Sequence, residues 1–212
     1  MPRLNFDQLI LVKVFTTGLI PMKNEIIEIG AFHLPTCETF HEKILLDKVS
    51  EKSMDDIAID IANYDHDVWE EEGKDSLEVL KSFQKFCSKH ANLKHLSKKN
   101  KSCYFAACAG FNCLSFDRIF IDRWFKKHEL YNPMDVRMYD IQQLVQWLYP
   151  NLQSYSLKYL DEYFLKEEEF DEMNGIMDEL FTQALILAAV FTKKLPHQNK
   201  MLERFYHNSI EG

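Results

Sequence analysis

The sequence contains little glycine or proline, and its cysteines show no spacing typical of metal cages or disulfide frameworks. Glycine and proline occur only 6 times each in 212 residues, and there is no Pro/Gly/Ser linker, internal repeat or low-complexity tract. One domain over residues 1–212 is therefore predicted. The five cysteines are odd in number and include no C-x-x-C pair, so they are interpreted as buried or half-exposed thiols in a reducing compartment (Cys37, Cys87, Cys103, Cys108, Cys113).

Long apolar runs and an excess of basic residues are also missing. The stretch Leu9–Val14 is too short to span a bilayer, and the N-terminus does not resemble a signal peptide. We therefore expect an intracellular protein, cytoplasmic or nuclear, without a membrane partner. The net charge of −8 argues against a surface that coats nucleic acid, so any nucleic-acid contact would be local. Hydrophobic residues make up 46% of the chain, which predicts a globular fold.

The apolar pattern changes period along the chain, from strand-like to helical. Residues 8–15, 25–34 and 39–46 read as three strands in an antiparallel meander, with a further short strand at 102–108. Helices are predicted at 76–90, 114–128, 139–149, 156–165 and 176–192, and a polar loop at 94–102. The aromatic residues Phe116, Phe120, Trp124 and Phe125 are interpreted as a core stripe of the second helix. This order of elements predicts an α/β domain with a mixed sheet.

Two short motifs on the first two predicted strands carry a resemblance to a known family. Residues 16–19 read Thr-Thr-Gly-Leu, and residues 26–31 read Ile-Ile-Glu-Ile-Gly-Ala. Together they resemble the DEDD superfamily of 3′–5′ exonucleases, the DnaQ-like or RNase T-like group, whose first motif reads D-x-E-T-T-G-L. The resemblance implies an RNase H-like exonuclease fold, with a mixed sheet of about five strands and helices on both faces.

Weaker matches extend this resemblance over about residues 6–190. Residues 110–112 (Gly-Phe-Asn) followed by Phe116-Asp117 are similar to the second motif of the family. Ser156-Leu157 with Leu160 is similar to its S-L-x-x-L stretch, and residues 174–184 fit its third motif, H-x-A-L-x-D-A, in register.

The resemblance also implies that catalytic positions of the family carry different residues here. Family members hold two divalent metal ions with four carboxylates, and a nearby histidine takes a proton from the attacking water. Lys13 stands at the position of the first aspartate and Phe15 at that of the paired glutamate. Asn174 stands at the position of the histidine, and an amide cannot accept a proton at neutral pH.

Acids remain at the second and third motifs. Asp117 matches the second-motif aspartate, and Glu179, preceded by Asp178, stands at the third-motif position. Asp117 and Glu179 could hold one metal ion weakly, but not the paired ions of the family reaction. We hypothesise that the ammonium of Lys13 replaces the metal by pairing with Asp117 and with Glu179 or Asp178. The alternative is an ordinary strand lysine that reaches solvent.

These substitutions favour a degenerate exonuclease-like domain without exonuclease activity, or with activity lower by several orders of magnitude. No tightly bound cofactor is expected, with Mg²⁺ or Mn²⁺ relevant only to residual activity. Binding of single-stranded DNA or RNA 3′ ends, of a replication, repair or RNA-processing protein, or of both would be retained. The resemblance implies that Thr17, Gly18 and Leu19 line the nucleic-acid groove.

Two other functions remain open from the sequence. One is an active, divergent 3′–5′ exonuclease with an altered one-metal site made of Asp117, Asp178 and Glu179. The other is a protein-interaction domain without nucleic-acid binding, which the net charge of −8 mildly supports.

Overall fold

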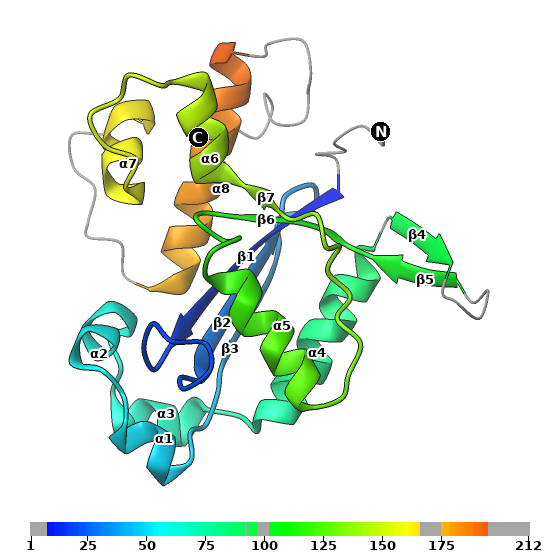
Figure 1. The fold of residues 1–212 in the computed structure, drawn as a ribbon, viewed down its shortest axis with the longest axis vertical. Coiled ribbons are helices and arrows are strands. Elements are labelled where there is room, and N and C mark those ends of the chain that lie inside the picture. Colours follow the sequence, from blue (N-terminus) through cyan, green and yellow to red (C-terminus); the bar gives the residue numbers. More distant parts are fainter. Residues whose placement is uncertain (1–7, 92, 97–101, 166–174, 195–212) are drawn as a thin grey trace.

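A mixed five-stranded sheet lies at the centre of the computed structural model, which describes residues 8–91, 93–96, 102–165 and 175–194 (Figure 1). Its strand order is β3-β2-β1-β6-β7. The strands are β1 (Leu9–Thr16), β2 (Ile26–His33), β3 (Glu38–Lys43), β6 (Ala107–Gly110) and β7 (Tyr139–Asp140). The predicted antiparallel meander is confirmed, because β2 pairs antiparallel with both β1 and β3. β6 is parallel to β1 and to β7, so the sheet is mixed as predicted.

Helices cover both faces of this sheet, as the sequence predicted. Ile10, Val12 and Val14 of β1 belong to the core on the side of α4 (Ser76–Lys89) and α5 (Asp117–Lys127). Leu9 and Leu11 belong to the core on the other side. That second core is covered by α6 (Ile141–Leu148), α7 (Leu157–Leu165) and α8 (Ile176–Lys194), seen together on the left of Figure 1.

This alternation along β1 determines where Lys13 lies. Successive side chains of a strand point to opposite faces, so Lys13 falls on the same face as Leu9 and Leu11, under α8. Every other residue of β1 is buried. Lys13 therefore places a charged group at the edge of an apolar core, where it requires an opposite charge.

Three short helices follow β3 and lie at the lower end of the sheet in Figure 1. They are α1 (Lys48–Lys52), α2 (Asp56–Ala62) and α3 (His66–Glu72). Asp47 and Asp65 accept backbone N–H hydrogen bonds at the starts of α1 and α3, respectively. Few of their residues are buried, but Trp69 of α3 donates its indole N–H to the Ile27 carbonyl at 3.1 Å. This bond joins the helices to β2.

The prediction of a polar loop at residues 94–102 is wrong where the structure describes it. β4 (Leu93–Leu96) pairs antiparallel with β5 (Ser102–Phe105), and the two form a hairpin that projects from the sheet (Figure 1). Strands of four residues, such as β4 (Leu-Lys-His-Leu), are too short to be recognised by a search for apolar periodicity. Lys98, Lys99 and Lys101 of the predicted loop lie outside the described residues.

Most of the remaining sequence-based assignments agree with the structure. Phe120, Trp124 and Phe125 are buried and Phe116 is half-buried, so the aromatic core stripe is confirmed. All five cysteines are free thiols, but Cys37 is exposed instead of buried or half-exposed, because it lies in the β2–β3 turn. In the part of the chain that is described, every helix is too short or too polar to cross a membrane.

Candidate functional site

The residues at the first and third motifs meet beside the end of β1. The Lys13 Nζ lies 3.3 Å from Oε2 of Glu179, which is in the first turn of α8. The two side chains are only 19% and 22% exposed, so the pair is largely shielded from solvent. A shielded ion pair is screened less by salt than a surface pair.

The second-motif aspartate reaches the same place from the other side of the sheet. The pairing of β6 with β1 reaches only Leu11, opposite Ala109, which leaves the following part of that β1 edge without a neighbouring strand. Asp117, the first residue of α5, fills this position, and its Oδ1 accepts the backbone N–H of Val14 at 2.8 Å. Asp117 is 1% exposed. Its carboxylate is thus fixed by β1 itself.

Charges in this cluster shift one another's pKa values. Burial raises the pKa of Asp117 to about 6, although the Lys13 charge and the Val14 N–H both act to lower it. Burial acts to lower the pKa of Lys13, but the negative charges of Asp117 and Glu179 outweigh it, so the pKa lies above its ordinary value. Lys13 is therefore a cation at neutral pH, and Asp117 titrates close to physiological pH.

The other predicted site residues lie around this cluster. Phe15 is buried among Ile27, Met54 and Ala62, and Lys13 Nζ lies 5.9 Å from the centroid of its ring. Its ring offers no oxygen to a metal ion. Asp178 is exposed in the first turn of α8, and Asn174 lies outside the described residues.

The residues present do not fit the paired-metal site of the DEDD exonucleases. Such a site needs a set of carboxylates around two ions. Here the first strand supplies an ammonium and a phenyl ring, and the ammonium is bonded to one of the remaining acids. Across the described ranges, no group of three or more His, Cys, Asp or Glu side chains could hold a metal ion.

A cleft of about 500 Å³ opens beside this cluster, between the end of β1 and α2. Gly18 and Leu19 line it, whereas Thr17 does not: that side chain is buried and accepts the Glu25 N–H. The α2 wall was not predicted from the sequence. The available signal was the spacing of Ile57, Ala58 and Ile61, which places three apolar side chains on one helical face. The lining residues are Lys13, Val14, Phe15, Thr16, Gly18, Leu19, Asp55, Asp56, Ile57, Ala58, Ile61 and Phe116.

The sheet order, the two helical layers and the meeting of three motifs at the end of β1 define an RNase H-like, DnaQ-type exonuclease fold. Solved structures of E. coli exonuclease I share it. One, in complex with a dA16 oligonucleotide, has a TM-score of 0.66 and 13% identity, covering 94% of this chain and 43% of that one. A zinc-bound complex with ssDNA has a TM-score of 0.65 and 12% identity, covering 93% of this chain and 42% of that one.

An exonuclease I complex with SSB-Ct gives similar values: a TM-score of 0.65, 13% identity, and coverage of 93% of this chain and 43% of that one. The chain thus spans less than half the length of these structures. At this identity the likeness establishes the fold, and the fold predicted from the motifs is confirmed. No protein-family model matches the chain. No curated protein matches it.

Proposed function

We propose that this chain is a catalytically degenerate 3′–5′ exonuclease-like domain that binds single-stranded nucleic acid without hydrolysing it. The observation that carries the proposal is the ion pair between Lys13 and Glu179, 3.3 Å apart and beside the buried Asp117. The ammonium supplies the positive charge that metal ions supply in an active site of this type. It cannot activate a water molecule as a metal ion does.

The electrostatics of the cluster support this loss of catalysis. A divalent ion between Asp117 and Glu179 would have to displace or repel the Lys13 ammonium, which remains charged at neutral pH. Phe15 offers no compensating ligand. The site therefore lacks the carboxylates that hold paired metal ions, and an ion could enter only if Lys13 moved.

The cleft supports retention of binding. Leu19, Ile57, Ile61 and Phe116 give it apolar walls on which bases can stack, and such contacts need no metal. The ligand is inferred from the fold, since exonuclease I of the same fold has been captured with an oligonucleotide. With a net charge of −8, nucleic-acid contact would be confined to this cleft.

The test combines a binding assay and a nuclease assay on 3′-labelled DNA and RNA oligonucleotides. We expect binding that persists as salt rises, because the cleft would hold bases by stacking and its one basic lining residue, Lys13, is paired with Glu179. Neither oligonucleotide should be shortened in Mg²⁺ or Mn²⁺. Leu19→Ala should weaken binding, because Leu19 lines the cleft. Leu96→Ala is the matched control: Leu96 is 67% exposed, close to the 71% of Leu19, but lies on β4 outside the cleft. Metal-dependent shortening would instead favour the divergent exonuclease.

A second candidate function is binding of a replication, repair or RNA-processing protein. It is favoured by exposed apolar side chains on both sides of the cleft, since Leu19 and Ile57 are 71% and 70% exposed. Exonuclease I, which shares the fold, has also been solved in complex with SSB-Ct. Absence of oligonucleotide binding at low as well as high salt would favour this function over the first.

A further inference from the structure

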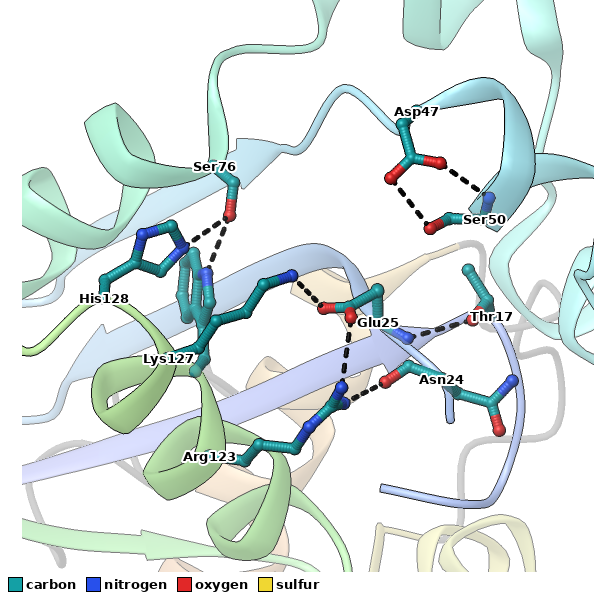
Figure 2. Close-up of polar contacts among 10 residues, drawn as sticks. Thr17, Asn24, Glu25, Asp47, Ser50, Ser76, Arg123, Lys127 and His128 are labelled. Atoms are coloured by element: carbon teal, nitrogen blue, oxygen red, sulfur yellow. Dashed lines mark hydrogen bonds and ion pairs between the residues drawn. The ribbon is translucent and has the colours of Figure 1, made fainter. Parts of the chain in front are cut away.

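The loop of residues 17–25, which connects β1 to β2, is held from outside by two basic residues of α5 (Figure 2). Arg123 donates from Nη1 to the Asn24 carbonyl at 2.6 Å and from Nη2 to Glu25 Oε1 at 3.1 Å. Lys127 lies one helical turn later, and its Nζ is 3.2 Å from Glu25 Oε2. Both oxygens of Glu25 are therefore bound by cations from one face of α5.

The contacts continue from Glu25 and Asn24 into the part of the loop that lines the cleft. The backbones of Glu25 and Thr17 are joined, because Thr17 donates its N–H to the Glu25 carbonyl at 2.9 Å. Thr17 Oγ1 accepts the Glu25 N–H at 3.0 Å. Asn24 Oδ1 accepts the Ile20 N–H at 2.9 Å, so the side chain of Asn24 spans the loop.

Gly18 lies directly against the side chains of Asn24 and Asp55. A Cβ atom at Gly18 would come within 2.7 Å of Asn24 Nδ2 and 2.2 Å of Asp55 Oδ2. Asp55 in turn donates its backbone N–H to the Thr17 carbonyl at 2.9 Å. The cleft wall made by Gly18 and Leu19 is thus held between α5, through Glu25 and Asn24, and the start of α2.

We infer that Glu25, bound by Arg123 and Lys127, is a positioning residue that fixes the Gly18–Leu19 wall for ligand binding. This rests on the proposed function, in which the cleft receives single-stranded nucleic acid. Glu25 is not among the residues that line the cleft, so it acts through the loop. The same helix supplies Asp117 at its first turn, and α5 therefore fixes both the charged cluster and the cleft wall.

The sign of the effect distinguishes positioning from simple electrostatics. Removing a negative charge should strengthen binding of an anionic oligonucleotide if Glu25 acts only through its charge. Loss of a preorganised wall should weaken it, because the loop must then be ordered on binding. Glu25→Ala should therefore weaken oligonucleotide binding by about 5- to 10-fold.

Arg123 provides a second variant, and α5 also offers a matched control. Arg123→Lys keeps the positive charge, but a lysine cannot donate to both Asn24 and Glu25 with one planar group. If Arg123 positions the loop, this variant should bind the oligonucleotide more weakly. If Arg123 instead contacts a phosphate directly, binding should be unchanged. Lys126→Ala removes a cation from an exposed position of the same helix, and it should leave loop and affinity close to those of the unmodified protein.

Hydrogen exchange of the loop amides and oligonucleotide affinity, measured for these three variants, test the inference. In Glu25→Ala and Arg123→Lys we expect faster exchange at Thr17, Ile20 and Asn24, unchanged exchange in β2, and weaker binding. Tighter binding by Glu25→Ala, or loop exchange unchanged from the unmodified protein, would overturn the inference. If the unmodified protein binds no oligonucleotide, the proposed function fails, while the exchange data still decide whether Glu25 orders the loop.

Discussion

Lys13 places a positive charge at the edge of an apolar core, close to the carboxylates of Glu179 and Asp117. A partly buried ammonium is tolerated only with opposite charges close by. Glu179 supplies a direct contact at 3.3 Å, and the negative charge of Asp117 raises the pKa of Lys13 further. The three groups stabilise one another as a unit, so removal of the cation should leave two acids close together without compensation.

Replacement of Lys13 tests this mutual stabilisation. Lys13→Met keeps most of the apolar stem of the side chain but removes its charge, so Glu179 loses its ion-pair partner and Asp117 loses a nearby positive charge. We expect the free energy of unfolding in urea at pH 7 to fall by about 1–3 kcal/mol. The control is Lys74→Met, which breaks the ion pair between Lys74 and Glu42 (N–O distance 2.6 Å). Lys74 is more exposed than Lys13, 47% against 19%, and exposed ion pairs contribute little. An equal loss of stability in both variants would contradict the account.

Asp117 should make the stability of the fold dependent on pH. Its pKa is about 6 in the folded chain, above the ordinary value of 3.8, so the folded state binds the proton more tightly than the unfolded state. The contribution of this group to stability is therefore greatest at about pH 4 and below and falls as pH rises through about 6. The loss amounts to about 1–3 kcal/mol across this window.

The variant Asp117→Asn isolates that dependence. An asparagine oxygen can still accept the Val14 N–H, but the side chain no longer ionises. The stability of the variant relative to the unmodified protein should therefore increase between pH 4 and pH 7, by about 1–3 kcal/mol in urea unfolding. A difference that does not change with pH would mean that Asp117 titrates normally.

At the scale of elements, the β1–β2 loop and the start of α2 approach each other closely at Gly18. A methyl group there would overlap Asp55 Oδ2 and Asn24 Nδ2, and Asn24 is buried and hydrogen-bonded. Gly18→Ala should therefore displace the cleft wall and weaken oligonucleotide binding by about 10-fold, with a loss of stability of about 1 kcal/mol. Gly175→Ala is a useful comparison, because its φ of +102° strains any side chain while no atom crowds the position. We expect both variants to be less stable, but only Gly18→Ala to bind the oligonucleotide more weakly. Equal weakening of binding in the two variants would contradict this explanation.

The elements that the sequence predicted are those with long apolar patterns. β1, β2 and α8 each bury continuous apolar runs, and their positions agree with prediction. β4 has four residues (Leu-Lys-His-Leu) and β7 has two, so neither is long enough to produce a recognisable period. The helices α1 to α3 bury only Ala62 and Trp69, which gives little amphipathic signal.

Some contacts of the candidate site could likewise be predicted from the sequence, and others could not. The motifs identified Lys13, Asp117 and Glu179 as neighbours, because their spacing matches a known arrangement. The contact of Arg123 with Glu25 joins residues 98 positions apart, and no local pattern indicates it. An arginine within an amphipathic helix was visible in the sequence, but its partner was not. Long-range polar contacts of this kind depend on how the helix packs on the sheet.

At the scale of the whole molecule, the sheet order brings distant segments to one end of β1. β6 lies beside β1, so the α5 helix that follows it begins close to Val14, while α8 crosses the opposite face at Lys13. Residues far apart in the sequence, Lys13, Asp117 and Glu179, are thereby brought close together.

We propose that the Lys13 ammonium, in contact with Glu179 and close to Asp117, takes the place of metal ions. A crystal of the protein soaked in Mn²⁺ tests it most directly, by anomalous density in the space between Asp117 and Glu179. The account predicts the Lys13 Nζ in contact with Glu179 and no ion in that space. Two Mn²⁺ ions bound between Asp117 and Glu179, with Lys13 displaced, would contradict it.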